Sequence, residues 1–124
     1  DRPLGMSAGA TSGARYERIE RASGGELPEA GVLSRTLARG AGVRLTWFGF
    51  AAGEELTEHT STRPALLHVL RGRAGLTLGE DAVEVGAGDL VRMEAGLRHS
   101  VRALEPLELV LTLLPADGTT GGAA

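Results

Sequence analysis

Short segments in which apolar and polar residues alternate make up most of the chain from residue 32 onward. In GVRLTWFGF, residues 42–50, Val43, Leu45 and Trp47 alternate with their neighbours. The segments before and after it are VLSRTLARG, ALLHVLRG, AGLTLGE, AVEVGAGD, LVRME, SVRALE and LELVLTLL. Gly, Pro, Glu-Asp or Ala-Gly separates most of them, and residues 40–114 show no sustained apolar stripe with helical spacing. The pattern predicts an all-β domain of short strands, either a sandwich or a barrel.

Two segments carry a further prediction each. The segment LELVLTLL has apolar residues on both faces, which indicates a strand buried on both sides or one at a subunit interface. In RYERIER, Tyr16 and Ile19 are the apolar residues among charges, and they favour either one helical turn or an edge strand.

The ends of the chain are rich in small residues. Residues 1–13 and 116–124 contain mostly Gly, Ala, Ser and Thr, so we expect two disordered tails around one domain at 14–115. Met6 is a candidate natural start, in which case residues 1–5 are a remnant of cloning.

The composition excludes several classes of function. The chain of 124 residues has no Cys and no Lys, which excludes disulfides, Cys-ligated zinc and Schiff-base chemistry. A net charge of −3 and few aromatic residues argue against a nucleic-acid partner. No apolar run reaches the roughly 20 residues of a membrane span, and the N-terminus lacks the apolar region of a secretory signal. We therefore expect a cytoplasmic protein without a membrane partner.

Two groups of residues match the spacing of a known pair of motifs. In the first group, successive gaps of five, one, three and six residues separate Gly53, His59, Ser61, Ala65 and Gly72. In the second group, gaps of five, one, two and three residues separate Gly88, Glu94, Gly96, His99 and Ala103. Both spacings are those of the two cupin motifs, so residues 40–114 resemble a small single-domain cupin of the RmlC-like, cupin 2 type.

The resemblance implies a fold and a metal site. Cupins are double-stranded β-helices, jelly-roll barrels of two antiparallel sheets, and many bind a divalent metal through three His and one Glu. Of these ligand positions this chain retains His59 and His99, while Ser61 and Ala65 replace the second His and the Glu. The resemblance thus implies a possible site for Fe, Mn, Ni or Zn that is incomplete, and a homodimer.

A third histidine is a candidate ligand on different grounds. On an unbroken strand, His68 points away from the face that carries Ala65, Leu67 and Val69, so a surface or subunit contact is the better interpretation. A bulge after Pro64 would reverse this and make His68 a metal ligand together with His59 and His99.

Alternation also predicts what surrounds the two matched histidines. Ser61, Arg63, Leu67 and Val101 are expected to face the barrel interior, where Arg63 would suit an anionic ligand. Trp47 is either a wall of the same pocket or a core residue. A mostly apolar pocket with a few polar groups is typical of a small-molecule site.

Three functions are consistent with these residues. The first is a metal-dependent oxygenase or isomerase. The second is a metal-independent enzyme in which His59 and His99 act as acid and base. The third is a ligand-binding or sensing module without catalysis.

Overall fold

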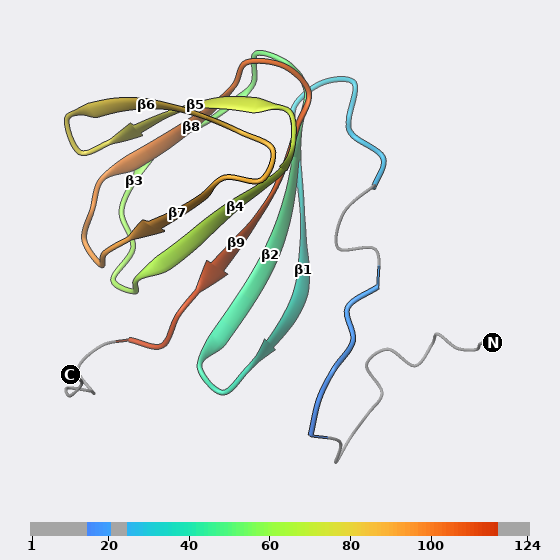
Figure 1. Cartoon of the computed structure of the whole chain (residues 1–124), viewed down its shortest axis with the longest axis vertical. Coiled ribbons are helices and arrows are strands. Elements are labelled where there is room, and N and C mark those ends of the chain that lie inside the picture. Colours follow the sequence, from blue (N-terminus) through green and yellow to red (C-terminus); the bar gives the residue numbers. More distant parts are fainter. Residues whose placement is uncertain (1–14, 21–24, 117–124) are drawn as a thin grey trace.

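The computed structural model describes residues 15–20 and 25–116, and all their regular structure is β-strand (Figure 1). The nine strands are β1 (Val32–Gly40), β2 (Val43–Phe50), β3 (Glu55–His59), β4 (Ala65–Arg71), β5 (Arg73–Leu78), β6 (Asp81–Gly86), β7 (Leu90–Met93), β8 (His99–Ala103) and β9 (Leu107–Leu113). Across this part of the chain, no helix is long and apolar enough to cross a membrane. The all-β prediction is confirmed.

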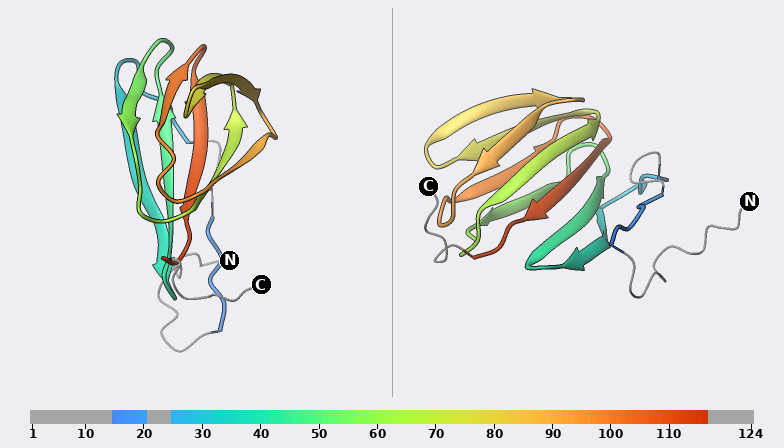
Figure 2. Two further views of the ribbon diagram at one scale, coloured as in Figure 1. Left: turned by 90° about the vertical axis from the view of Figure 1, so that its left-hand side faces the viewer. Right: turned by 60° about the horizontal axis from the view of Figure 1, so that its bottom comes forward.

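The strands form two facing sheets (Figures 1 and 2). One sheet has five strands in the order β1-β2-β9-β4-β7, and the other has four in the order β3-β8-β5-β6. Neighbouring strands in both sheets are antiparallel. This is the jelly-roll barrel that the motif spacing implied.

The hydrophobic core lies between the sheets, and alternation decides which residues reach it. On β4, Ala65, Leu67 and Val69 are buried while His68 is exposed. Alternate residues of the other strands meet them, among them Phe50, Leu76, Val101 and Leu109. Because side chains on a strand point alternately to opposite faces, the inward set is fixed once the register is fixed.

The apolar pattern of β9 is explained within one chain. β9 lies between β2 and β4, at the centre of the larger sheet. Its outward residues Glu108 and Val110 are only 1% and 8% exposed, although no second subunit is present. The pattern therefore carries no information about a subunit interface.

Gly72 shows why the first motif ends in glycine. It joins β4 to β5 with φ of 91°, in the left-handed region. A Cβ atom at this position would lie 2.1 Å from the carbonyl oxygen of Pro106, so the close approach of the two backbones leaves no room for a side chain.

Three sequence predictions need revision or lie outside the structure. The alternating segments included none within residues 51–64, but Glu55–His59 form β3, an edge strand with mostly exposed side chains. Residues 15–20 form neither the expected helical turn nor a strand. The predicted tails, 1–13 and 116–124, lie outside the described residues except for Ala116.

Candidate functional site

His59 and His99 meet at one end of the barrel. They are cross-strand partners, His59 as the last residue of β3 and His99 as the first of β8. Their ring centroids are 4.2 Å apart and the planes are inclined by 63°, an edge-to-face arrangement. The spacing of the two motifs thus brings together the two histidines that it singled out.

Each imidazole is fixed by the carbonyl oxygen two residues before it in sequence. His59 Nδ1 lies 2.8 Å from the Thr57 oxygen, and His99 Nδ1 lies 3.0 Å from the Leu97 oxygen. Since a carbonyl only accepts hydrogen bonds, both Nδ1 atoms carry the proton. The neutral form of each ring therefore has its lone pair on Nε2, and no described residue bonds either Nε2 atom.

The two rings differ in their access to solvent. His99 is 7% exposed and lies opposite Leu78 of β5, at the margin of the core. His59 is exposed, as expected at the end of an edge strand. The nearby charges are paired with each other, because Arg98 contacts Glu58 at 3.3 Å. Because His59 is exposed, the His59–His99 pair is open to solvent on the side of His59.

Ser61 and Arg63 hold the loop that follows β3. The Ser61 hydroxyl accepts the Arg63 N–H at 3.0 Å, and the Ser61 carbonyl accepts the Gly96 N–H at 2.8 Å. The Arg63 guanidinium donates to the carbonyl of Leu114 at 2.8 Å and to that of Gly42. These contacts with the backbone account for the positions of both side chains without a ligand. They connect the loop after β3 to the segments at Gly42 and Leu114.

Trp47 lies on the outer face of the larger sheet and not beside the histidines. Its strand neighbours Phe48 and Phe50 pack into the core, so alternation directs Trp47 outward. It is nonetheless 3% exposed, because Gly25 lies against the ring and the Arg35 guanidinium lies 4.9 Å from the ring centroid. The prediction that Trp47 forms a wall of the pocket is wrong. Its ring is buried, as that of an inward residue would be, but the segment that covers it lies on the outer face of the sheet.

Leu67 and Val101 face inward as expected, but they belong to the packed core. They contact other apolar side chains from both sheets, including those of Leu76, Met93 and Leu109. The interior beside them is therefore occupied by the protein itself.

His68 does not join the other two histidines. It is exposed on β4, with Leu90 and Val110 as its cross-strand partners. The bulge after Pro64 that would turn it inward is absent from this strand, whose pairing with β7 runs without a shift from Ala65 to His68.

The donors near the pair do not fit a cupin metal centre. The Nδ1–carbonyl contacts are typical of metal-ligating histidines, whose free Nε2 would face the ion. A catalytic metal usually needs at least three protein ligands, however. Within residues 15–20 and 25–116, no three His, Asp or Glu side chains come together in a way that could hold an ion. The Ser61 hydroxyl is engaged by Arg63 N–H, and Ala65 has no donor.

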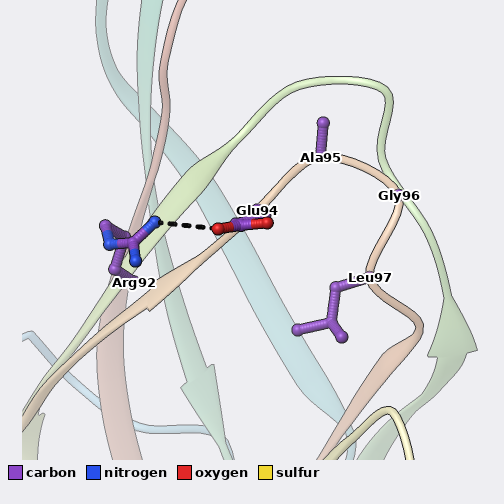
Figure 3. Close-up of a pocket in the computed structure, with 5 residues that line it drawn as sticks. All are labelled: Arg92, Glu94, Ala95, Gly96 and Leu97. Carbon is purple, nitrogen blue, oxygen red and sulfur yellow. Dashed lines mark ion pairs between the residues drawn. The ribbon is translucent and has the colours of Figure 1, made fainter. Parts of the chain in front are cut away.

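An open depression lies on the connection between β7 and β8 (Figure 3). Arg92, Glu94, Ala95, Gly96 and Leu97 line it, and Arg92 contacts Glu94 at 3.7 Å. Both charged side chains are largely exposed, so Glu94 is a surface residue whose charge is screened by solvent.

Two carboxylates that the sequence did not single out, one buried and one half-buried, accept hydrogen bonds from distant segments. Glu108 accepts hydrogen bonds from Trp47 Nε1 at 2.8 Å and from Gly25 N at 3.2 Å. Glu54, which is half-buried, accepts the N–H of Gly31 at 3.1 Å. Their partners lie far away in the sequence, so no local pattern could have revealed them.

Solved structures of other proteins share this fold. A conserved protein of unknown function from Streptococcus pyogenes is 27% identical, with a TM-score of 0.69 over 75% of this chain and 82% of the other. A cupin superfamily protein from Desulfitobacterium hafniense is 24% identical, with a TM-score of 0.71 over 82% and 93% of the two chains. KdgF from Halomonas sp. is 22% identical, with a TM-score of 0.62 over 73% and 84%.

Comparison with protein sequences gives a match at the level of the family. None of the curated proteins matches this chain. The family described as the cupin domain matches residues 46–114, more than half of the chain and the part that contains both motifs. The chain belongs to the cupin family.

Proposed function

We propose that this cupin binds a small polar molecule at the His59–His99 pair and that binding requires no metal ion. The observation that carries the proposal is the pair of free Nε2 atoms on two rings 4.2 Å apart. Each ring is held by a backbone carbonyl, so both Nε2 atoms have fixed positions before a ligand arrives. Preorganised polar groups bind with a smaller loss of conformational entropy than mobile ones.

The chemistry of imidazole defines the class of ligand. A neutral Nε2 accepts a hydrogen bond, and a protonated one donates. A hydroxyl group donates to a neutral Nε2 and a carboxylate accepts from a protonated one, so hydroxy acids and other small carboxylic acids are the expected ligands. The same pair has the groups needed for proton transfer in an isomerisation, cyclisation or elimination, which would make binding the first step of catalysis.

The ligand is expected at the end of the barrel and not deep inside it. The core residues around Leu67 and Val101 pack against one another, whereas His59 is exposed. A molecule approaching from the solvent would meet His59 first and then His99, whose ring lies at the margin of the core.

Ligand-induced stabilisation tests the proposal. A panel of small hydroxy acids and carboxylic acids is added to the protein in a chelating buffer, and the melting temperature is recorded. Compounds that bind at the pair should raise the melting temperature of the native chain and of the His68→Ala variant. They should have no effect on His59→Ala or His99→Ala. Equal stabilisation of all four proteins would place binding elsewhere and end the proposal.

A metal-dependent oxygenase or isomerase is the second candidate. The Nδ1–carbonyl contacts favour it, because they leave two imidazole Nε2 atoms available. Water or substrate would have to supply the remaining ligands. Elemental analysis of untagged protein after reconstitution with iron, manganese, nickel or zinc decides between the two candidates. Less than about a tenth of an equivalent of metal bound would rule out this candidate, since functional metal sites load close to stoichiometrically.

A homodimer is a separate proposal that rests on the family resemblance. The pattern on β9 no longer supports it, since one chain buries both faces of that strand. Sedimentation equilibrium over a range of concentrations gives the mass directly, and a monomer throughout that range would contradict it.

A further inference from the structure

The segment before β1 is bound to the outer face of the larger sheet. We call residues 25–31 the strap (light blue in Figure 1, where it leads into β1). Two glycines are its anchors, Gly25 at one end and Gly31 at the other, and each has both its N–H and its carbonyl bonded.

The anchor at Gly25 is built around a buried carboxylate. Gly25 donates to Glu108 Oε2 at 3.2 Å, and its carbonyl accepts from the Arg71 guanidinium at 2.9 Å. Arg71 Nε and Glu108 Oε1 are 3.4 Å apart, so the two side chains that bind the glycine also pair with each other. Trp47 Nε1 donates to Glu108 Oε2, the oxygen that also accepts from Gly25, at 2.8 Å.

The anchor at Gly31 is built in the same way around Glu54. Gly31 donates to Glu54 Oε2 at 3.1 Å, and its carbonyl accepts the N–H of Ala51 at 3.0 Å. A carboxylate thus accepts the N–H of the strap at both ends. Charge-assisted bonds of this type are stronger than bonds between neutral groups.

Between the anchors, Leu27 occupies a gap in the sheet surface. A Cβ atom at Gly49 would lie 2.9 Å from Leu27 Cδ2 and 2.5 Å from Trp47 Cη2. Glycine at position 49 therefore makes room for both side chains. The strap covers Trp47 and is held by shape as well as by hydrogen bonds.

The anchor at Gly31 also reaches the two strands that carry the histidines. The Glu54 carbonyl accepts the N–H of Ala103 at 2.8 Å, and the Ala103 carbonyl accepts the N–H of Gly53 at 2.9 Å. Ala103 is the last residue of β8, which begins at His99. Glu54 therefore binds the strap through its side chain and β8 through its backbone, directly before β3 begins.

β3 is held against β8 on one side only, and its other contacts are two exposed ion pairs, Glu55–Arg102 and Glu58–Arg98, and the packing of Leu56 on the core. It is an edge strand of five residues that pairs with β8 alone. Its pairing with β8 is regular at Glu55 and Leu56 and shifts before His59. The contacts of Glu54 hold the start of β3, where its regular pairing with β8 begins.

We propose that the strap is a positioning element for the His59–His99 pair, with Glu54 as the positioning residue that connects them. A docked strap holds the start of β3 against β8 and so sets how the two imidazoles meet. Release of the strap frees β3 and changes the pair. The meaning of this coupling for ligand binding rests on the proposed function, but the coupling itself is measured without a ligand, so the two proposals can fail separately.

The experiment uses the full chain and its three histidines and single tryptophan as reporters. In the Leu27→Asp variant the strap should leave the sheet, and acrylamide should then quench the fluorescence of Trp47. We expect the imidazole nitrogen signals of His59 and His99 to shift, and those amides of β3 that bond to β8 to exchange about tenfold faster. The amides of β6, at the far edge of the other sheet, should exchange as in the native chain, which distinguishes coupling from general destabilisation.

A second pair of variants tests the link itself. Glu54→Ala removes the acceptor of the Gly31 N–H and should alter the signals of His59 and His99. Glu54→Gln keeps an oxygen acceptor and should restore them. Glu29→Ala, an exposed change within the strap, is the matched control and should match the native chain. Native signals for His59 and His99 in Leu27→Asp with an exposed Trp47, or in Glu54→Ala, would overturn the proposal. So would a Trp47 that stays protected in Leu27→Asp, since docking would not then depend on Leu27.

Discussion

His59 and His99 face each other edge to face at 4.2 Å, and each binds the carbonyl two residues before it through Nδ1. The tautomer of both rings follows from this arrangement. Long-range proton–nitrogen correlation spectra above neutral pH should show a protonated Nδ1 and an unprotonated Nε2 for both residues. His68 has no such hydrogen bond described and is the comparison. Nε2–H tautomers at both His59 and His99 would contradict the geometry on which the proposed site depends.

Removal of the Glu108 carboxylate should be costly. Glu108→Ala leaves the buried Trp47 N–H without its acceptor and Arg71 without its carboxylate partner. We expect a loss of about 2–4 kcal/mol in the free energy of unfolding, followed by urea denaturation with Trp47 fluorescence. The exposed change Glu29→Ala should stay within about 0.5 kcal/mol. Similar losses in both variants would show that Glu108 has no special part in the fold.

Two glycines with similar backbone angles should respond differently to alanine. Gly72 and Gly53 have φ of 91° and 85°. A Cβ at Gly72 would lie 2.1 Å from the Pro106 oxygen, whereas a Cβ at Gly53 would meet nothing within 4 Å. Gly53→Ala should therefore cost about 1–2 kcal/mol, the strain of the backbone angle alone. Gly72→Ala should cost clearly more in the same urea titration, and equal costs would refute the close approach at Gly72.

Arg63 should affect stability and not ligand binding. Its guanidinium donates to the carbonyls of Leu114 and Gly42, which it connects to the loop after β3. Arg63→Ala should lower the free energy of unfolding by about 1–3 kcal/mol, because the half-buried Leu114 carbonyl loses its donor. The increase in melting temperature caused by a bound ligand should persist. Loss of that increase with little change in stability would return Arg63 to the binding site.

The sequence predicted those features that depend on period and spacing. Alternation along β4 placed His68 outward and Leu67 inward, and both placements agree with the structure. Motif spacing singled out His59 and His99, which the fold brings together as cross-strand partners. The first prediction works because side chains on a strand point alternately to opposite faces. The second rests on the spacing of the two motifs.

The features that could not be predicted depend on contacts between distant segments. The strap covers Trp47 on the outer face of its strand, so apolar residues occupy both faces there. Without a polar face, alternation does not distinguish inward from outward residues. β3 was not among the strands that alternation predicted, because an exposed edge strand has no apolar face. Glu54 and Glu108 looked like ordinary acids, since their partners Gly31 and Gly25 are 23 and 83 residues away.

The most direct test of the metal-free site observes the three histidines while ligands are added. The imidazole nitrogen signals of chelator-treated protein are recorded during titration with small hydroxy acids and carboxylic acids. The account predicts that at least one compound shifts the signals of His59 and His99 together, leaves His68 unchanged, and has no effect on the remaining histidines of His99→Ala. Signals of His59 and His99 that respond only after a transition metal is added would contradict it.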